Sequence, residues 1–382
     1  MTTYDVIVAG GGTMGTAAAW ALGKRGVRVL VLEQFSHVHT LGAHGGKTRV
    51  IRHAYAEGPE YIPLVLRADE LWCQLGDEIG ETVLHRVGAL EMAAPGYTHA
   101  RRARDSAAAH SVPFEWLEPA EVRRRWPAFR IPDDWEAGFG ARSGFLVVEP
   151  ALHGMATLAR RLGVTIREHE PVTVWGATPD AVWVETQHGR YEAARLIVTA
   201  GAWAGKVLAD LGLPLTIQRK ILWWLDVEDP SWFAPERFPV FITDSPHGEI
   251  YGFPIFQQPG LKIANHAGGE PCDPDTVDRT AREGENTDVV GLARWFFPGV
   301  TNRVVSSAVC LYARTPDSHF ILDRHPRRPQ VIIAAGFSGH GFKFAPAIGE
   351  HLADLALDAA TQPYPLFALT RFAPMISQSP AG

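Results

Sequence analysis

The chain has 382 residues, of which 46% are hydrophobic and 20% charged, values typical of a globular protein that exclude a disordered or collagen-like chain. Its 36 Lys and Arg against 42 Asp and Glu give a net charge of -6, which disfavours nucleic acid as a partner because the phosphates would be repelled. No stretch reaches the roughly 18 apolar residues of a membrane span, and the three distant cysteines suggest neither disulfides nor a metal site. We therefore expect a cytoplasmic protein with no membrane, nucleic acid or metal as partner.

The predicted elements begin with a βαβ unit. Hydrophobic periodicity predicts a strand over residues 4–9, a helix over about 13–24 and a second strand over 28–33. The following segments are predicted as a helix over 59–75, strands over 83–92, most of 135–148 and 217–226, a helix over 151–162 and a strand over 195–199. The stretch from 217 to about 311 has the pattern of an antiparallel sheet, and an α/β pattern returns from about 316, with a helix beginning near 343.

This alternation predicts an α/β fold in which a Rossmann-like, dinucleotide-binding domain is interleaved with a sheet-rich α+β domain. The first domain is assigned residues 1–80, 150–215 and 315–382. The second, which would hold the substrate, is assigned residues 81–149 and 216–314.

The first motif is a GxGxxG segment between the first strand and the first helix. Gly10 permits the tight turn, Gly12 lets the backbone approach a pyrophosphate at the helix N-terminus, and Gly15 allows the helix to pack closely on the strand. Glu33, at the end of the second strand, would accept hydrogen bonds from the ribose hydroxyls. The motif predicts dinucleotide binding, without separating NAD from FAD.

Two more glycine-rich turns follow predicted strands, one containing Gly201 and one containing Gly339 and Gly341. Each is either a ligand-binding turn or only a tight connection. A basic segment over 44–53 contains Arg49 and Arg52, which would share one face of a helical turn; the alternative is a solvated basic loop.

Lysine is rare in this chain, with six lysines against thirty arginines. A retained lysine therefore suggests a need for a compact ammonium, and Lys262 lies in an otherwise apolar stretch over 260–264. The alternative is a strand lysine whose end reaches solvent.

Taken together, these residues resemble the family of monomeric sarcosine oxidases and N-methyltryptophan oxidases, flavoenzymes of the glycine/D-amino-acid oxidase superfamily. The resemblance covers nearly the whole chain. It is most specific over 47–55, 251–254, 260–262, 310–312 and 336–344. It implies that the GxGxxG segment binds the ADP part of FAD. It also implies that the flavin lies between an FAD-binding domain and a sheet-rich substrate domain.

The resemblance further implies that Cys310 carries the FAD covalently through a thioether. A nearby cation such as Arg49 would lower the pKa of the thiol and stabilise negative charge on the flavin. The alternative is that Cys310 is a buried structural thiol.

The same resemblance assigns the substrate side of the site. Arg52 and Lys343 would hold the substrate carboxylate, and Lys343 would also contact the cofactor. Tyr251, Tyr312 and His266 would shape the pocket and favour the neutral amine, although His266 could equally be a strand histidine with a satisfied hydrogen bond.

Lys262 matches the family's oxygen-activating lysine, whose fixed ammonium stabilises the anion that forms when dioxygen takes its first electron. Thr48 would help to orient this ammonium through a water molecule.

Two positions depart from the family pattern. Gly45 replaces a histidine, which is expected to open space near the flavin, and Lys47 replaces an aspartate, which is expected to add a cation there. Both departures make sarcosine itself doubtful as the best substrate. Gly45, Trp223 and Trp224 would leave room for a larger one, unless the two tryptophans belong to the core.

We therefore expect an FAD-dependent oxidase of secondary amino acids, with N-methyl amino acids as the first choice. Hydride transfer to flavin N5 would give an imine that hydrolyses, and O2 would be reduced to hydrogen peroxide. The alternatives are an oxidase of a cyclic imino acid such as pipecolate or proline, an oxidase of a glycated amino acid, a non-catalytic flavin-binding subunit and an NAD-dependent dehydrogenase. Family members of this length suggest a monomer.

Overall fold

The computed structural model describes residues 4–373, in which strand β1 (Tyr4–Ala9), helix α1 (Thr13–Lys24) and strand β2 (Val29–Leu32) form the predicted βαβ unit. Around it lies the eight-stranded sheet A, whose strands β20, β12, β1, β2 and β9 run parallel. Antiparallel partners extend the sheet beside β20 and along the first half of β12. The added strands of sheet A are β9 (Thr165–Arg167), β10 (Val174–Ala177), β11 (Val182–Thr186), β12 (Gly189–Val198), β19 (Ile321–His325) and β20 (Arg328–Ala335).

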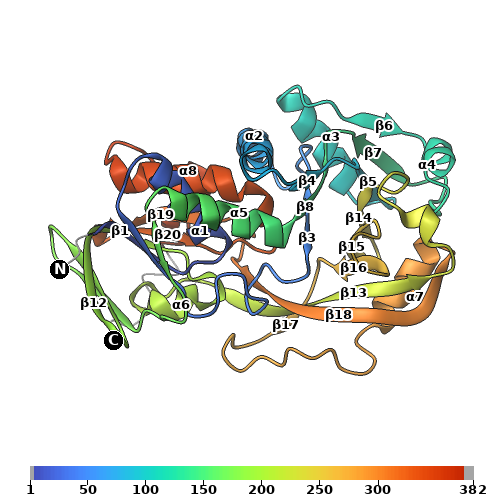
Figure 1. Ribbon diagram of the computed structural model, residues 1–382. Coiled ribbons are helices and arrows are strands. Elements are labelled where there is room, and N and C mark those ends of the chain that lie inside the picture. Colours follow the sequence, from blue (N-terminus) through green and yellow to red (C-terminus); the bar gives the residue numbers. More distant parts are fainter. Residues whose placement is uncertain (1–3, 374–382) are drawn as a thin grey trace.

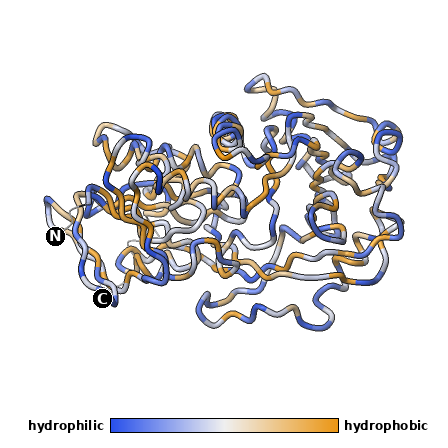
Figure 2. Tube along the Cα trace, in the orientation of Figure 1, coloured by the Kyte–Doolittle hydropathy of each residue, from blue (hydrophilic) through white to orange (hydrophobic). Residues whose placement is uncertain are grey.

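Three helices cover one face of sheet A, and a fourth packs on two of them. Helix α1 packs between α5 (Val148–Arg161) and α8 (Ala345–Leu357), and α2 (Ile62–Ile79) lies against α5 and α8, as Figure 1 shows in its left half. The central strands of this sheet are almost continuously apolar and buried, and they form the hydrophobic centre of this lobe in Figure 2. This burial fixes the glycine-rich turn between β1 and α1 at the carboxyl edge of the sheet.

The second lobe is built on the nine-stranded, largely antiparallel sheet C. Its strands, in spatial order, are β17 (Glu270–Pro271), β13 (Thr216–Val227), β16 (Leu261–Asn265), β15 (Gly248–Phe253), β14 (Val240–Ser245), β5 (Ala89–Ala93), β7 (Glu136–Gly140) and β6 (Glu115–Leu117), with β18 (Val300–Arg314) paired along β13. The long strands β13 and β18 run along the lower edge of Figure 1 from the middle of the molecule into this lobe. A cluster rich in phenylalanine packs beneath the sheet against α7 (Thr287–Phe296).

A small third sheet lies between the lobes, where β8 (Gly144–Val147) pairs with β3 (Thr48–Ile51) and β4 (Leu84–His85). The remaining helices are α3 (His99–Ala109), α4 (Pro119–Arg125), α6 (Ala204–Val207) and the 3-10 turns Pro59–Tyr61, Gly201–Trp203, Ala209–Leu211, Pro230–Phe233, Phe342–Phe344, Pro365–Phe367 and Leu369–Phe372. Among residues 4–373, no helix is both long and apolar enough to cross a membrane.

The predicted elements are confirmed in most places and wrong in two. Arg49 and Arg52 do not share a helical turn, because 48–51 form strand β3, where residues three apart face opposite sides. Helix α7 lies inside the stretch that was predicted as sheet. Its β-branched and aromatic residues favoured a strand, whereas its buried residues follow a helical spacing. The structure shows which sheet each segment joins, whereas the two-domain boundaries stay a prediction.

Candidate functional site

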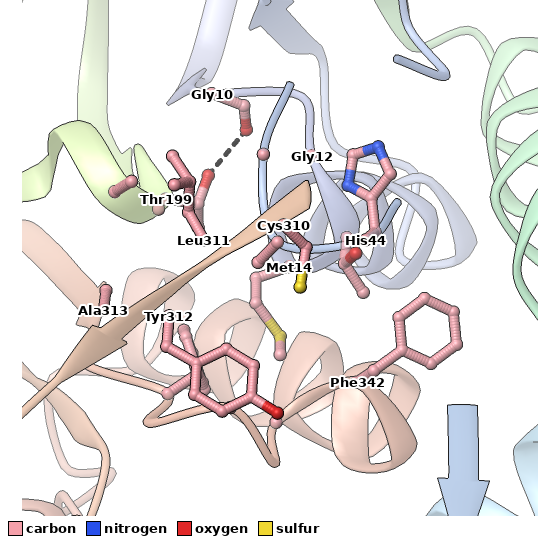
Figure 3. Close-up of a pocket in the computed structure, with 18 of the residues that line it drawn as sticks. Gly10, Gly12, Met14, His44, Thr199, Cys310, Leu311, Tyr312, Ala313 and Phe342 are labelled. Carbon is pink, nitrogen blue, oxygen red and sulfur yellow. Dashed lines mark hydrogen bonds between the residues drawn. The ribbon is translucent and has the colours of Figure 1, made fainter. Parts of the chain in front are cut away.

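A cavity of about 410 Å³ lies between sheets A and C, with walls from both lobes. Figure 3 shows the thiol of Cys310, the hydroxyl of Tyr312 and the side chains of Met14, His44 and Phe342 around one space. The predicted site residues that line the cavity are Gly10, Gly12, Glu33, Arg49, Arg52, Gly201, Tyr251, His266, Cys310, Tyr312, Gly339, Gly341 and Lys343. Gly15, Thr48 and Lys262 lie behind the lining.

The glycine-rich turn is shaped by close backbone contacts. Gly10 has a φ of +102°, a conformation that favours glycine, and a Cβ at Gly15 would lie 1.9 Å from the carbonyl oxygen of Gly10. The hydroxyl of Thr199 donates to the same carbonyl over 2.7 Å, the contact drawn as a dashed line in Figure 3. Helix α1 is thereby held against the end of β1 at a separation that only glycine permits.

The N-terminus of α1 fits the phosphates of a dinucleotide. Its N-cap residue Gly12 makes no side-chain capping bond, and no acidic residue lies in the first turn. A Cβ at Gly12 would meet nothing within 4 Å, so the free backbone N–H groups face open cavity. Unsatisfied donors at the positive end of a helix dipole are a general anion site.

Glu33 supports the turn from the end of β2. Its carboxylate accepts from the backbone N–H of Gly11 over 2.7 Å and of Phe35 over 2.9 Å. Burial raises the pKa of Glu33, and these bonds oppose the shift. Since Glu33 also lines the cavity, its remaining lone pairs can accept from a ribose.

The middle of the cavity carries histidine, arginine and cysteine. His44 is buried, its Nε2 has no hydrogen-bond partner among residues 4–373, and burial lowers its pKa to about 3. Arg49 donates to the carbonyl oxygens of Ala43, Gly45 and Thr48 over 2.5–2.7 Å, which fixes its charge at the cavity wall. An unpartnered buried nitrogen and a fixed cation fit the polar edge of a flavin.

Cys310 lies on β18 and is 1% exposed. Burial raises the pKa of its thiol, while Arg49, Lys262 and Lys220 oppose that shift. The expectation that nearby cations lower this pKa is therefore wrong for the protein without its ligand, because the cost of charging a buried sulfur exceeds their attraction.

Lys262, on β16, is 3% exposed, which excludes a strand lysine that reaches solvent. Its ammonium donates to the carbonyl of Gly46 over 2.6 Å and to the carbonyl and hydroxyl of Thr48 over 2.8 and 2.9 Å. The contact with Thr48 is direct rather than through water. Burial, followed by the charge of Arg49, holds the pKa of Lys262 well below its usual value.

Two tyrosines and a histidine form another part of the cavity wall. The hydroxyls of Tyr251 and Tyr312 lie 3.4 Å apart, and that of Tyr312 lies 3.4 Å from Nδ1 of His266. Burial lowers the pKa of His266 to about 3 and raises that of Tyr251 to about 12. A Cβ at Gly339 would lie 2.1 Å from the Tyr312 ring, so glycine lets this wall close. All three groups are neutral at physiological pH.

Two buried cations, Lys343 and Arg52, face the same end of the cavity. Lys343 donates to the carbonyl of His340 over 2.8 Å and to the hydroxyl of Tyr55 over 3.2 Å, and burial together with Arg52 lowers its pKa to about 7. Arg52 donates through Nη2 to both oxygens of Glu57 over 2.6 and 2.8 Å. Its Nη1 is buried without a hydrogen-bond partner among residues 4–373. This free donor beside an ammonium fits an anionic group such as a carboxylate.

A buried carboxylate holds the segment that carries Arg52. Asp69 of α2 accepts from Nε2 of His53 over 3.1 Å and from Arg86 and Arg142 over 2.6–3.2 Å. The backbone N–H of His53 also donates to the hydroxyl of Ser143 over 3.2 Å. These bonds tie the end of β3 to α2 and to the turn before β8, so the position of Arg52 is fixed from outside the cavity.

Several residues at this end were not anticipated from the sequence. The carboxylates of Glu57 and Glu249 line the cavity, and behind it the carboxylate of Glu91 forms a buried pair with Nε2 of His99, 2.8 Å away. Glu91 interrupts an apolar strand, and Glu249 precedes Tyr251 by two residues on one strand. Period-two alternation would have placed Glu249 on the face of Tyr251.

The departures from the family pattern lie away from the cavity wall. The side chain of Lys47 is exposed, and neither Lys47 nor Gly45 lines the cavity. Trp223 and Trp224 are each 5% exposed and pack in hydrophobic clusters. The two tryptophans therefore belong to the core, which was the alternative, and the effect of Gly45 and Lys47 on the choice of substrate stays a prediction.

Comparisons with known proteins give full-length matches. The family model of FAD dependent oxidoreductases, DAO, matches residues 5–355. The monomeric sarcosine oxidase of Bacillus sp. (strain B-0618) is 38% identical over 94% of this chain and 94% of its own length. The N-methyl-L-tryptophan oxidase of Yersinia pestis (strain Pestoides F) is 36% identical over 97% of this chain and 99% of its own. Among solved structures, NikD, an unusual amino acid oxidase essential for nikkomycin biosynthesis, superposes with a TM-score of 0.84 at 26% identity, over 96% of this chain and 98% of that one.

Proposed function

The chain belongs to the FAD-dependent oxidoreductase family of the monomeric sarcosine oxidases and N-methyl-L-tryptophan oxidases, and on this premise we propose that it oxidises N-methyl amino acids with covalently held FAD. The observation that carries the proposal is the pairing of Lys343 with the free Nη1 of Arg52 in the cavity that also holds the Cys310 thiol. A carboxylate bound there would place the amine of the substrate among neutral groups.

The cavity residues have two different roles toward the substrate. Arg52 and Lys343 bind the carboxylate, one through a planar fork and one through a compact ammonium. Tyr251, Tyr312 and His266 stay uncharged, so the cavity favours the neutral amine, the form whose nitrogen lone pair assists hydride loss from the neighbouring carbon. Bound FAD would supply the hydride acceptor for this carbon, and O2 would take the electrons as hydrogen peroxide. Water hydrolyses the imine product.

The cofactor is held at two places in this proposal. The N-terminus of α1 and Glu33 would hold its ADP half, and the thiol of Cys310 would hold its ring through a thioether.

The alternatives differ in their support. The family match leaves the NAD-dependent reading without support, and similarity to oxidases over the full chain argues against a non-catalytic subunit. Oxidation of a cyclic imino acid or a glycated amino acid needs the same carboxylate site and stays open to test. The name of the sarcosine oxidase relatives supports a monomer, and we retain the cytoplasm as the place of action.

The test is a peroxide-coupled assay of the purified, FAD-loaded protein with N-methyl amino acids, cyclic imino acids and glycated amino acids. We expect peroxide with N-methyl amino acids and bleaching of the flavin absorption when the same substrates are added without oxygen. Peroxide from the cyclic or glycated compounds alone would replace the N-methyl class by that class. Absence of both signals for every compound would contradict an amine oxidase.

The pH dependence of carboxylate binding tests the role of Lys343. Because its pKa is about 7, the ammonium is present below that pH and lost above it, whereas His266 and His340, with pKa values of about 3 and 4, stay neutral. We expect the Kd of benzoate, followed by the flavin spectrum, to rise about tenfold per pH unit above 7 until the pKa of the complex is reached. Lys343→Met should bind weakly with a flat profile; an unchanged slope in this variant would assign the titration to another group.

A further inference from the structure

Three carboxylates lie at the substrate end of the cavity. Those of Glu57 and Glu249 line it, with side chains 20% and 28% exposed, and that of Glu91 lies directly behind, 1% exposed. They come from the segment after β3, from β15 and from β5. No two of them are close in sequence, so the fold brings them together.

Strand register explains why two of them face the cavity side of sheet C. Ile242 of β14 pairs with Glu91 on one side and with Tyr251 on the other, so the three side chains form one row across the sheet. Glu249 lies two residues before Tyr251 on β15 and points to the same face. The face of sheet C that carries Tyr251 therefore also carries the carboxylates of Glu91 and Glu249.

The protein satisfies two of these carboxylates and leaves the third nearly free. Glu57 accepts two bonds from Arg52, and Glu91 accepts from His99 over 2.8 Å and lies 3.6 Å from Nη1 of Arg52. Among residues 4–373, the carboxylate of Glu249 accepts no hydrogen bond; its nearest cationic partner is Nδ1 of His99, at 4.0 Å. Burial raises the pKa of Glu249, and the positive charges of His99 and Arg52 do not fully offset this shift.

Charge at this end is not balanced by an ordinary amino acid. The cations near these carboxylates are Arg52, Lys343 and Lys220, with His99 as a fourth if it is protonated, and Asp244 adds a further carboxylate beside Glu249. His266 and His340 stay neutral, and Arg49 lies on the side of Cys310. A substrate that brings a carboxylate and a neutral amine adds one negative charge. Even with a protonated His99, the filled site would then be negative, which is unfavourable in a buried cavity.

We propose that the substrate of this chain is a secondary amino acid whose side chain ends in a cation, an ammonium or guanidinium group that pairs with Glu249. The cation supplies the partner that Glu249 lacks and restores neutrality at this end of the cavity. Arg52 and Lys343 hold the α-carboxylate, so the two charged groups of the substrate are recognised by side chains of opposite charge. This inference rests on the proposed oxidase function and adds the substrate class.

The experiment compares Nα-methyl-L-lysine with Nα-methyl-L-norleucine, which differ at the side-chain end by an ammonium and a methyl group. We expect kcat/KM of the wild-type holoenzyme to favour the lysine derivative by at least about tenfold, mainly through KM. Glu249→Gln keeps the size of the side chain and removes its charge, and should bring the ratio close to one. Asp244→Asn is the matched control, since Asp244 pairs with Glu249 across β14 and β15 but does not line the cavity, and should keep the preference.

The outcomes separate the inference from the proposed function. Equal or better oxidation of the norleucine derivative by the wild-type enzyme would overturn the inference and leave the oxidase function standing. A preference for lysine that survives in Glu249→Gln, or that vanishes equally in Asp244→Asn, would overturn the assignment to Glu249. Oxidation of neither compound, nor of any other N-methyl amino acid, would overturn the proposed function and the inference with it. The flavin spectrum of each variant shows whether it has folded and loaded its cofactor.

Discussion

Acid precipitation of the Cys310→Ala variant is expected to leave all of its flavin in the supernatant, whereas the wild-type pellet stays yellow. Cys310 is a cysteine on the cavity wall, while Cys73 and Cys272 lie elsewhere, so one substitution should abolish the covalent link completely. The variant should still fold and bind FAD reversibly, because the cradle at α1 and Glu33 is untouched. The measurement is the absorption of pellet and supernatant at the flavin bands.

Cys73→Ala and Cys272→Ala serve as matched controls and should both keep a yellow pellet. The reaction itself requires a thiolate, and burial alone disfavours that form. Arg49, Lys262 and Lys220 supply the opposing positive charge, so attachment should be slower when Arg49 is replaced. A yellow supernatant from the wild-type protein would show a noncovalent flavoprotein, and a yellow pellet from Cys310→Ala would place the bond at another residue.

Replacement of Lys262 by methionine is expected to slow the reaction with dioxygen by about 10²–10³, the usual effect of removing one preorganised charge from a site where an anion forms. Three oxygen acceptors from Gly46 and Thr48 fix the Lys262 ammonium directly behind the cavity lining, close to the charge of Arg49 and to Cys310. Reduction of the bound flavin by substrate should change much less, because Lys262 does not line the cavity that holds the substrate. Rapid-mixing measurements of the two half-reactions, with and without oxygen, separate these effects.

Lys47→Met is the control for this prediction. Lys47 lies beside Gly46 in the same loop, but its side chain is exposed, so its removal changes the charge of the loop without touching the buried ammonium. Both half-reactions should proceed as in the wild type. If Lys262→Met slowed both half-reactions equally, the lysine would serve the structure of the loop rather than the activation of oxygen.

The parts of the site that could be predicted from sequence are those fixed by short-range geometry. The turn between β1 and α1 needs glycine at Gly10 because of its positive φ and at Gly15 because a Cβ would meet the carbonyl oxygen of Gly10, and both reasons are local. Glu33 closes the next strand at a fixed distance along the chain. The cavity-lining residues Cys310, Tyr312 and Lys343 were anticipated through segments that resemble a family, not through their spacing.

The acidic end of the cavity could not be predicted, because it depends on the order of strands in sheet C. Glu91 and Tyr251 meet only because β14 lies between β5 and β15, with β14 parallel to β5 and antiparallel to β15. Nothing in the local sequence around Glu91 indicates that register. That Gly45 and Lys47 lie outside the cavity lining could not be predicted for a related reason, because sequence alone does not show the path of a loop.

The row formed by Glu91, Ile242 and Tyr251 has an evolutionary consequence. Its members sit on three strands whose pairing depends on backbone groups, so exchanging one side chain leaves the ladder of hydrogen bonds intact. The cofactor cradle is built into the other sheet and is not disturbed by such an exchange. Changes at Glu91 and Ile242 can therefore alter which substrates fit, while Tyr251 and the cofactor cradle are retained.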